Sequence, residues 1–555
     1  MVRRIFLMMS KLLLSVTAVA VILAQFTYAS NETDPSQLRE LDSEGLVLPN
    51  PNKAIVDRFF PNGPLTLHSS KFSVPTVPPV ESPVGVETEK PLRCLAFSGG
   101  GIRSALFSIG VLKALGETNE LYNFNVISSV SGGGYAAGWF YAGMHRLRLS
   151  RSNLPEIKEM FTPAELRRVA VSIKDEYYEN EVVRNAADGL YGLTSIGFAV
   201  PFLPLDVLKG SPGLKGESYA AIQYRTRLER AFLGATKSQS LLTFLGTKAT
   251  PTLKELWETV RQLNLPVFVF NATVHGASTA TPLSDLIFNF TSVNYGSKYT
   301  GFSDVDDDYT IGDAIAISGA ALDMPLANPV AGTLRNYSGV TLGRSIPAIR
   351  GDDKTSSYWL SDGGHIDNLG AFTLLKYGCS PIFIVDAEED PEYRFNGYRK
   401  LKDLAKRYLN RDVHIPEIDE FVNANSKQAR TFRFPLNLAP PVTVGWVDAP
   451  KSAYSEVKSA ARIIYIKLAY NPQWFPESHF LKTQPQREFP HYPTLNQYGI
   501  SEDGMIGLIT LGAASADVAL LAERDYDVGL KEISKILNDE NYLLSILRKA
   551  QQKNK

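Results

Sequence analysis

Residues 93–140 read RCLAFSGGGIRSALFSIGVLKALGETNELYNFNVISSVSGGGYAAGWF, and they contain two glycine-rich turns. The first turn, residues 99–101, follows the apolar run 92–97, and the second is centred on Ser131, which follows the strand-like run 125–130. A serine on a strand-to-helix turn exposes its hydroxyl at the positive end of the helix dipole. A glycine-rich turn nearby can offer backbone N–H groups to an oxyanion. The stretch therefore predicts a serine hydrolase that acts on an ester.

The nucleophile turn departs from the usual pattern at one position. A nucleophile elbow favours small residues two positions before and two positions after the serine, because strand and helix pack closely there. These positions are Ser129 and Gly133, and Ser129 stands where glycine is usual. For this motif taken by itself, a serine that only caps the following helix is the alternative interpretation.

A second motif supplies a candidate base. Residues 361–365 read SDGGH, after the strand-like residues 358–360 and before a predicted helix. Two glycines beside Asp362 allow this turn to approach another loop with little steric cost. A carboxylate within hydrogen-bond reach of a serine can act as its general base without a histidine. The alternative is a turn aspartate that caps the following helix.

The three motifs, in this order, resemble those of the patatin-like phospholipases. That family has a G-G-G-x-R/K oxyanion motif, a G-x-S-x-G nucleophile motif and a D-G-G/A motif, which match residues 99–103, 129–133 and 362–364. Residues 314–321 resemble the family's helix of small residues, and residues 381–387 resemble the strand after the aspartate's helix. The resemblance covers roughly residues 91–390.

The resemblance implies a lipid acyl hydrolase that uses a Ser-Asp dyad, an acyl-enzyme and no cofactor or metal. The implied nucleophile is Ser131, and the implied base is Asp362. The implied oxyanion cradle consists of Gly99, Gly100 and Gly101, and the implied supporting residues are Arg103, Gly133 and Gly363. For Arg103 we favour a structural role, through carboxylate contacts that anchor the glycine turn, over contact with an anionic head group.

The alternation of strands and helices predicts an α/β fold with three layers, in which a mixed, mainly parallel sheet lies between helices. Ligands in such folds bind at the carboxyl ends of the strands, where both glycine turns lie. The strands are expected at 92–98, 125–130, 265–274, 358–360 and 381–385, and the helices at 102–115, 135–144, 253–263 and 369–377.

Four segments are expected along the chain. Residues 1–29 predict a signal peptide, because basic residues, an apolar run and small residues follow one another in that order. Residues 30–90 are a proline-rich extension, and residues 91–390 are the catalytic domain, with an insertion at about 145–250. Residues 391–555 are expected to pack on the catalytic domain and to end in amphipathic helices.

The signal peptide predicts export to a periplasm, a membrane surface or the medium. An uncleaved anchor is the alternative, because the apolar stretch is close to the length of a membrane span. The apolar segment at 193–208 is expected to be buried, with a lid or an interfacial element as alternatives.

Composition argues against several other classes of partner. A net charge of −1 over 555 residues gives no field for nucleic acid. The spacing G-x-G-x-x-G is absent, which argues against a dinucleotide.

Cys94 and Cys379 are expected to be two buried thiols, and the two cysteines and scattered histidines give no metal-ligand spacing. The acidic run at 304–308 is expected to be a solvated loop rather than a calcium site. The oligomeric state is unknown.

Two alternative functions stay open at the level of sequence. A Ser-His-Asp esterase would use one of His275, His365 and His491, although each of these is interpreted as structural. A catalytically silent module that binds lipid or protein would keep the fold without the chemistry. The intact Ser131 and Asp362 favour the enzyme.

Overall fold

The structure is a computed structural model, and it describes most of the chain between residues 91 and 525. The described residues are 91–177, 219–236, 238–239, 248–275, 277, 280–305, 307–320, 344–347, 357–428, 439–449, 460–470, 489–493 and 500–525. The predictions for residues 1–29, 30–90, 193–208 and 529–555 lie outside these residues.

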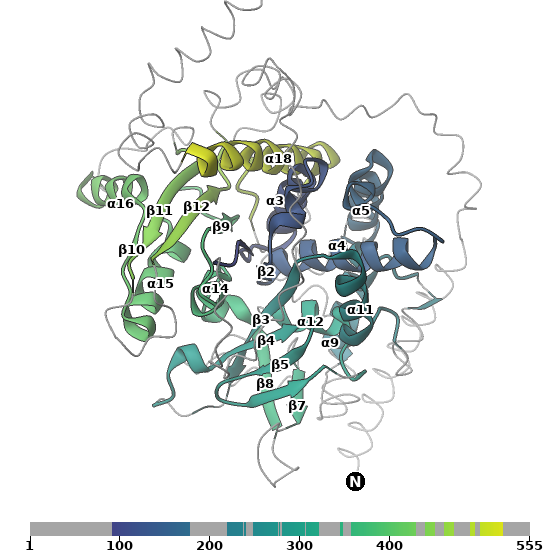
Figure 1. Cartoon of the computed structure of the whole chain (residues 1–555). Helices are drawn as coiled ribbons and strands as arrows, with labels where there is room; N and C mark the ends of the chain where they lie inside the picture. Colours follow the sequence, from purple (N-terminus) through teal and green to yellow (C-terminus); the bar gives the residue numbers. More distant parts are fainter. Residues whose placement is uncertain are drawn as a thin grey trace, which may run out of the picture.

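One sheet organises the described part of the chain (Figure 1). Its order is β10-β11-β12-β9-β1-β2-β3-β4-β5-β6, and β3 also pairs with β8, which pairs with β7. The strands are β1 (Cys94–Phe97), β2 (Val126–Ser129), β3 (Val267–His275), β4 (Ile287–Thr291), β5 (Asn294–Ser297), β6 (Gly301–Asp304), β7 (Arg344–Pro347), β8 (Ser357–Asp362), β9 (Ile382–Asp386), β10 (Val413–His414), β11 (Val442–Val447) and β12 (Ala461–Lys467).

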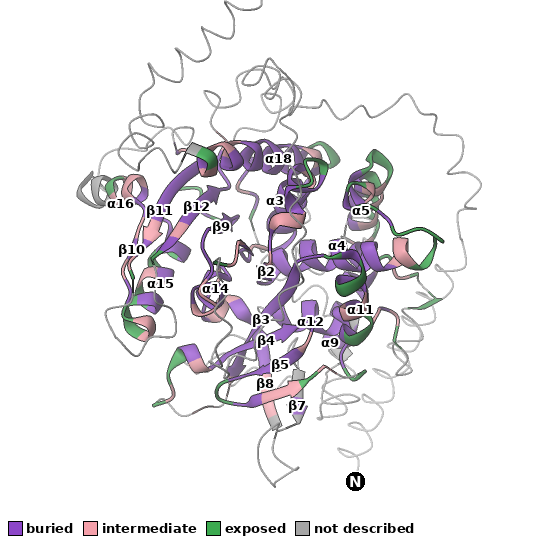
Figure 2. Ribbon diagram, in the orientation of Figure 1, coloured by how far each residue is buried: buried purple, intermediate pink, exposed green. Residues whose placement is uncertain are grey.

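The five central strands, from β12 to β3, run parallel, and the pairs outside this block are antiparallel. Strands of a parallel block are buried on both faces, so they are almost entirely apolar rather than alternating. β1 (CLAF) and β9 (IFIVD) follow this rule, and every residue of both strands is buried (Figure 2). The predicted mixed sheet between helices is confirmed.

Helices cover the sheet, with α3 and α18 on one side of its β9–β12 end and α14 and α15 on the other (Figure 1). The helices are α3 (Gly101–Glu117), α4 (Gly132–Leu149), α5 (Pro163–Tyr177), α9 (Tyr219–Leu228), α11 (Leu253–Leu263), α12 (Ile311–Ser318), α14 (Ala371–Lys376), α15 (Asn396–Leu404), α16 (Pro416–Gln428) and α18 (Glu502–Asp525). The predicted helix at 253–263 matches α11. The one predicted at 135–144 is longer, since α4 begins directly after Ser131.

The C-terminal part does more than pack against the rest. β12 pairs with β9 in parallel register over residues 463–467, so the chain beyond residue 391 completes the same sheet. Among the described residues, the segment 502–524 of α18 has the length and hydropathy of a membrane span, but 78% of its apolar window is buried inside the protein. It packs along α3, where it acts as a core helix.

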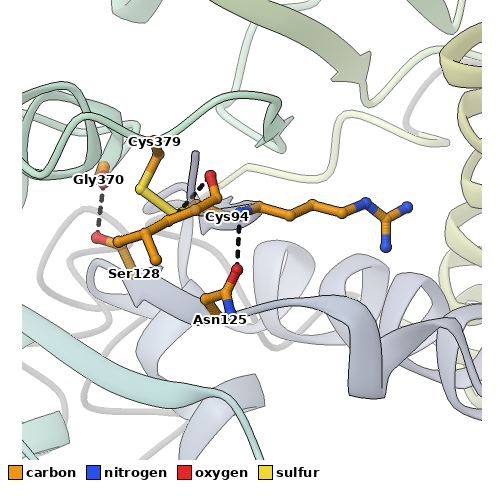
Figure 3. The surroundings of a disulfide bond; sticks show 7 residues. Cys94, Asn125, Ser128, Gly370 and Cys379 are labelled. Atoms are coloured by element: carbon orange, nitrogen blue, oxygen red, sulfur yellow. Dashed lines mark hydrogen bonds between the residues drawn. A yellow bond between two sulfur atoms is a disulfide. The ribbon is translucent and has the colours of Figure 1, made fainter. Parts of the chain in front are cut away.

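The cysteines correct one prediction. Cys94 and Cys379 are not free thiols but form a disulfide, with their Cα atoms 5.9 Å apart (Figure 3). The bond joins β1 to the turn between α14 and β9, two segments that the parallel pairing of β1 with β9 brings together. Beside it, Ser128 Oγ donates to Gly370 O over 2.6 Å. Both cysteines were placed correctly in buried positions, but their partnership depends on a contact across 285 residues.

Candidate active site

Ser131 lies on a strained turn between β2 and α4. Its φ of 49° and ψ of −119° are a combination that residues with a side chain rarely adopt. The glycines that follow Ser131 make the turn possible. A Cβ on Gly133 would lie 2.6 Å from Phe97 Cβ, and a Cβ on Gly132 would lie 2.1 Å from Gly101 O. The elbow therefore packs directly against the first glycine turn.

The sheet itself brings the second motif to Ser131. β3 is longer than β2: its residues 267–270 pair with β2, and its residues 272–275 pair with β8. β4 occupies the opposite edge of β3, so β2 and β8 share one edge. β2 is parallel to β3 and β8 is antiparallel to it, and hence the two strands run toward each other. Ser131 follows the end of β2 and Asp362 ends β8, which places the two residues together.

Asp362 is a buried carboxylate in contact with Ser131. It is 5% exposed, and its Oδ1 accepts the Gly364 N–H over 2.7 Å. Burial raises the pKa of Asp362 to about 7, against the opposing effects of the Gly364 N–H, a hydrogen bond with the Ser131 hydroxyl and the charge of Lys400. A carboxyl group with a pKa near neutrality can both take and return a proton.

The glycine turn offers two free N–H groups. Gly100 has φ 138° and Gly101 has φ 63°, values that favour glycine. The Gly99 N–H donates to Asn368 O over 2.8 Å, so it is not available to an oxyanion. Of the three glycines predicted to form the oxyanion cradle, Gly100 and Gly101 remain. Among the described residues, neither Gly100 N–H nor Gly101 N–H has a hydrogen-bond acceptor. The Ser131 N–H is also engaged, because it donates to Ser318 Oγ over 2.9 Å.

Arg103 anchors the first glycine turn. Its side chain is buried, with Nε donating to Ala387 O over 3.1 Å and Nη1 donating to Tyr492 O. Burial lowers the pKa of Arg103 to about 10, while the nearby carboxylates, of which Glu389 has the largest effect, act in the opposite direction. These contacts are structural, but they are with backbone carbonyl groups, whereas the prediction was that carboxylates would anchor the turn. A Cβ on Gly100 would lie 2.6 Å from the same Ala387 oxygen, which explains why the turn needs glycine there.

A buried cluster of charged side chains holds the segment that carries the Ala387 carbonyl. Lys467 Nζ, at the end of β12, lies 2.7 Å from Asp386 Oδ2 and 3.1 Å from Asp390 Oδ2. Tyr465 donates to the same Asp386 oxygen over 2.5 Å. Asp386 precedes Ala387, so residues from the C-terminal part hold the carbonyl on which the glycine turn rests.

Asn271 is a central residue that the sequence analysis missed. It is 2% exposed, and its Nδ2 donates to Ser128 Oγ over 2.8 Å and to Ser129 O over 2.9 Å. Its carbonyl accepts from Ser318 Oγ over 2.7 Å, and its Oδ1 accepts from Thr373 Oγ1 over 2.9 Å. It thus ties β2, α12 and α14 together under Ser131. A lone amide inside the apolar run VFVFNATV was the available signal.

Ser129, which stands where the elbow usually has glycine, makes a side-chain hydrogen bond. Its side chain is buried, and its Oγ donates to Val269 O on β3 over 3.3 Å. The elbow therefore accommodates serine in place of glycine because the hydroxyl finds an acceptor on the neighbouring strand. Gly363 follows the usual rule, since a Cβ there would lie 2.4 Å from Asn271 O.

The histidines have partners away from the dyad. His275 Nε2 hydrogen-bonds to Ser361 Oγ, which lies 3.0 Å from His365 Nδ1. Ser361 and Asp362 are consecutive strand residues, so their side chains point to opposite faces. The His491 ring packs against Tyr393, with 5.2 Å between ring centroids, and burial lowers the pKa of His491 to about 3.

The described residues contain no group of three or more His, Cys, Asp or Glu side chains that could hold a metal ion. Within the acidic run, Asp304, Asp307 and Asp308 are exposed, as predicted for a solvated loop.

Three solved structures share a distant likeness with the chain. Human GIVD cytosolic phospholipase A2 is 12% identical at a TM-score of 0.41, with 82% of this chain and 60% of that chain covered. Its complex with methyl gamma-linolenyl fluorophosphonate is 13% identical at the same TM-score, with 83% and 60% covered. VipD from Legionella pneumophila is 14% identical at a TM-score of 0.27, with 83% and 80% covered. The chain spans about 60% of the length of the human protein, and no curated protein matches it.

The family comparison is more extensive. The family model described as "Patatin-like phospholipase" matches residues 95–375, which contain both glycine turns, Ser131 and the Asp362 motif. The match covers just over half of the 555 residues, and the chain therefore belongs to the patatin-like phospholipase family.

Proposed function

We propose that this protein is an exported lipid acyl hydrolase in which Ser131 is the nucleophile and Asp362 the general base. Family membership supports the coarser part of this statement, hydrolysis of lipid acyl esters. The observation that carries the finer part is the contact between the strained Ser131 and a buried carboxylate whose pKa is about 7.

In the first half of the reaction, the ionised Asp362 takes the Ser131 proton while Oγ attacks the acyl carbonyl carbon. The negative charge that develops on the carbonyl oxygen is stabilised by the N–H groups of Gly100 and Gly101, aided by the N-terminus of α4. The tetrahedral intermediate collapses, the ester C–O bond breaks, and the departing alcohol takes the proton from Asp362. The acyl group then remains on Ser131.

In the second half, water replaces the alcohol. Asp362 takes a proton from the water as its oxygen attacks the acyl carbon, and the second tetrahedral intermediate expels Ser131. Asp362 returns the proton to Oγ, and the free acid leaves. One carboxyl group thus acts as base and as acid in each half, which requires a pKa near the working pH.

Export is supported by two independent features. The N-terminal 29 residues have the order of regions typical of a signal peptide. Disulfides persist in oxidising compartments and are rare in the cytosol, so the Cys94–Cys379 bond fits an exported protein.

The test combines a fluorophosphonate probe with product analysis on mixed phospholipid vesicles. Wild type is expected to be labelled and to release fatty acid, whereas Ser131→Ala abolishes both. Asp362→Asn is expected to lower the rate by about a hundred- to ten-thousand-fold, the usual contribution of general acid–base catalysis. For wild type, the rate of labelling and the rate of fatty acid release should both fall below about pH 7, where Asp362 becomes protonated.

His365→Ala is the control for a histidine-dependent triad, and it should stay within a few-fold of wild type. An inactive, folded His365→Ala beside an active Asp362→Asn would overturn the dyad. Folded wild-type protein that neither labels nor releases fatty acid would instead favour a silent binding module. Mass spectrometry of the released acids and lysolipids identifies the substrate.

A further inference from the structure

The side chain of Asn368 lies between the oxyanion turn and the loop of the candidate base. A Cβ on Gly99 would lie 2.1 Å from Asn368 Oδ1 and 3.4 Å from Ser131 Cβ. A Cβ on Gly364 would lie 2.5 Å from the same Asn368 oxygen and 3.1 Å from Asp362 Oδ1. Both glycines therefore make room for this oxygen, which lies close to both members of the dyad.

A carboxylate fixes which end of the Asn368 amide faces the dyad. Asn368 Nδ2 donates to Glu388 Oε1 over 2.5 Å, and Glu388 Oε2 accepts the Gly397 N–H over 2.9 Å. The backbone oxygen of Asn368 accepts the Gly99 N–H over 2.8 Å. Because the carboxylate of Glu388 only accepts hydrogen bonds, it takes the NH2 end of the amide, and the carbonyl end remains for the dyad.

Asn368 Oδ1 is an acceptor that no N–H or O–H group of the described residues occupies. Asn368 is half-buried, so its side chain is in contact with solvent. An acceptor of this kind suits a reactant that brings its own proton. In the proposed reaction, that reactant is the water of the second half.

The two halves of the reaction differ in the protons that the reacting oxygen carries. A water molecule has two: Asp362 takes one during attack, and the other can still donate to Asn368 Oδ1. The alcohol oxygen of an ester carries no proton, and it receives one from Asp362 only as the C–O bond breaks. An acceptor at this place therefore assists the attack of water and not the attack of Ser131.

We propose that Asn368 orients the hydrolytic water, and that Glu388 is a positioning residue that keeps the Asn368 carbonyl oxygen turned toward the dyad. The proposal rests on the proposed function above. As the water oxygen attacks the acyl carbon, one of its O–H bonds breaks and that proton goes to Asp362. The second O–H bond stays intact and donates to Asn368 Oδ1. The bond between Ser131 and the acyl carbon then breaks, and Ser131 recovers the proton from Asp362.

The same arrangement favours water over an alcohol as the acyl acceptor. An alcohol has one proton, which Asp362 takes, so none remains for Asn368. Loss of the Asn368 acceptor should therefore slow hydrolysis more than it slows transfer of the acyl group to an alcohol. Both products come from one acyl-enzyme, so their ratio does not depend on the fraction of protein that is folded.

The test compares Asn368→Ala with wild type on a chromogenic fatty acyl ester in buffer with added methanol. Fluorophosphonate labelling and the initial burst of leaving group should stay within about three-fold of wild type, because both report the attack of Ser131. Hydrolysis should fall by about three- to thirty-fold, the usual effect of one hydrogen bond, and the ratio of methyl ester to free acid should rise by the same factor. Intact mass spectrometry should show more acyl-enzyme than in wild type.

Glu388→Gln tests the orientation of the Asn368 amide without removing it. The Gly397 N–H is part of the backbone and only donates, so the oxygen of the new side chain stays on it and the new NH2 group faces Asn368. Asn368 must then turn its carbonyl oxygen to that NH2 group, which leaves its own Nδ2 toward the dyad. The ratio of methyl ester to free acid should rise in this variant as well.

Asn123→Ala is the matched control, since the Asn123 amide also donates to a glutamate, Glu120, over 3.1 Å. Asn123 lies before β2, at the opposite end of that strand from Ser131, and its loss should leave the product ratio unchanged.

An Asn368→Ala variant that loses labelling and hydrolysis equally, with the product ratio of wild type, overturns the proposal. If that variant does not fold, an unmoved ratio in Glu388→Gln overturns it instead. Failure of the wild type to label, or labelling of Ser131→Ala, would contradict the proposed function itself.

Discussion

At the scale of single residues, Lys400 is a cation whose charge affects the pKa of the candidate base, Asp362. It lies on α15, outside the stretch matched by the family model, and its Nζ donates to His365 O over 2.8 Å and to Gly364 O over 3.3 Å. Its charge opposes the effect of burial on the pKa of Asp362. Lys400 thus anchors the loop that carries Asp362 and favours the ionised form of that carboxyl group.

Lys400→Met is expected to raise the pKa of Asp362 further, because burial then acts with less opposition. The labelling rate at pH 6.5 should fall by about two- to ten-fold, and the deficit should shrink at pH 9, where the carboxyl group is ionised again. Lys402→Met is the matched control on the same helix, since Lys402 pairs with Asp419 at the surface. Equal losses at both pH values in Lys400→Met would contradict an electrostatic role.

At the scale of elements, glycines set the distance between α3 and α18. A Cβ on Gly512 would lie 2.0 Å from Phe107 O, and a Cβ on Gly110 would lie 2.0 Å from Ile509 O. Each glycine therefore allows one helix backbone to touch the other. α3 begins at Gly101 in the candidate oxyanion turn, so its position affects the site as well as the core.

Gly512→Ala is expected to destabilise the protein by about 1–3 kcal/mol, because the added methyl group meets backbone that cannot rotate away. Urea unfolding measures the change. Gly134→Ala is the control, since a Cβ there has no neighbour closer than 3.6 Å and alanine favours a helix. A Gly512→Ala variant as stable as wild type would show that the helices separate at little cost.

A buried acid on the same helix predicts a pH-dependent stability. Burial raises the pKa of Asp517 to about 7, and its Oδ2 has no hydrogen-bond partner among the described residues. Between about pH 4 and 7 the unfolded chain loses this proton before the folded chain does, so stability falls as pH rises. Asp517→Asn should therefore add roughly 1–4 kcal/mol to the free energy of unfolding at pH 8 and little at pH 4. The exposed Asp503→Asn is the control, and an equal gain at both pH values would refute the titration.

At the scale of the whole molecule, the disulfide closes a loop around the part of the chain that the family model matches. Cross-linking residues this far apart restricts the unfolded state, and loss of a native disulfide typically costs about 2–5 kcal/mol. The double variant Cys94→Ser, Cys379→Ser is expected to melt at lower temperature than wild type. A reductant should lower the melting temperature of wild type alone, and no response in either protein would mean that the bond is absent.

The local parts of the fold and the site were predictable from the sequence. Glycine-rich turns and periods of apolar residues act over a few positions, so the strands at 92–98 and 381–385 and the elbow at Ser131 could be predicted before the structure. The order of the three motifs was enough to indicate the family. Residues such as Asn271 were missed because a buried amide is interpretable only once its partners on other elements are known.

The sequence by itself determined which turns are candidates for chemistry, because glycine and serine at fixed spacing dictate a backbone that few other residues can adopt. Tertiary structure alone decided that Ser131 meets Asp362, since β2 and β8 share one edge of β3 and run toward each other. It also decided that Cys94 pairs with Cys379, and that Lys400 reaches the loop of Asp362 from beyond the three motifs. These contacts join segments far apart in the chain, and such contacts depend on how the whole sheet and its helices pack.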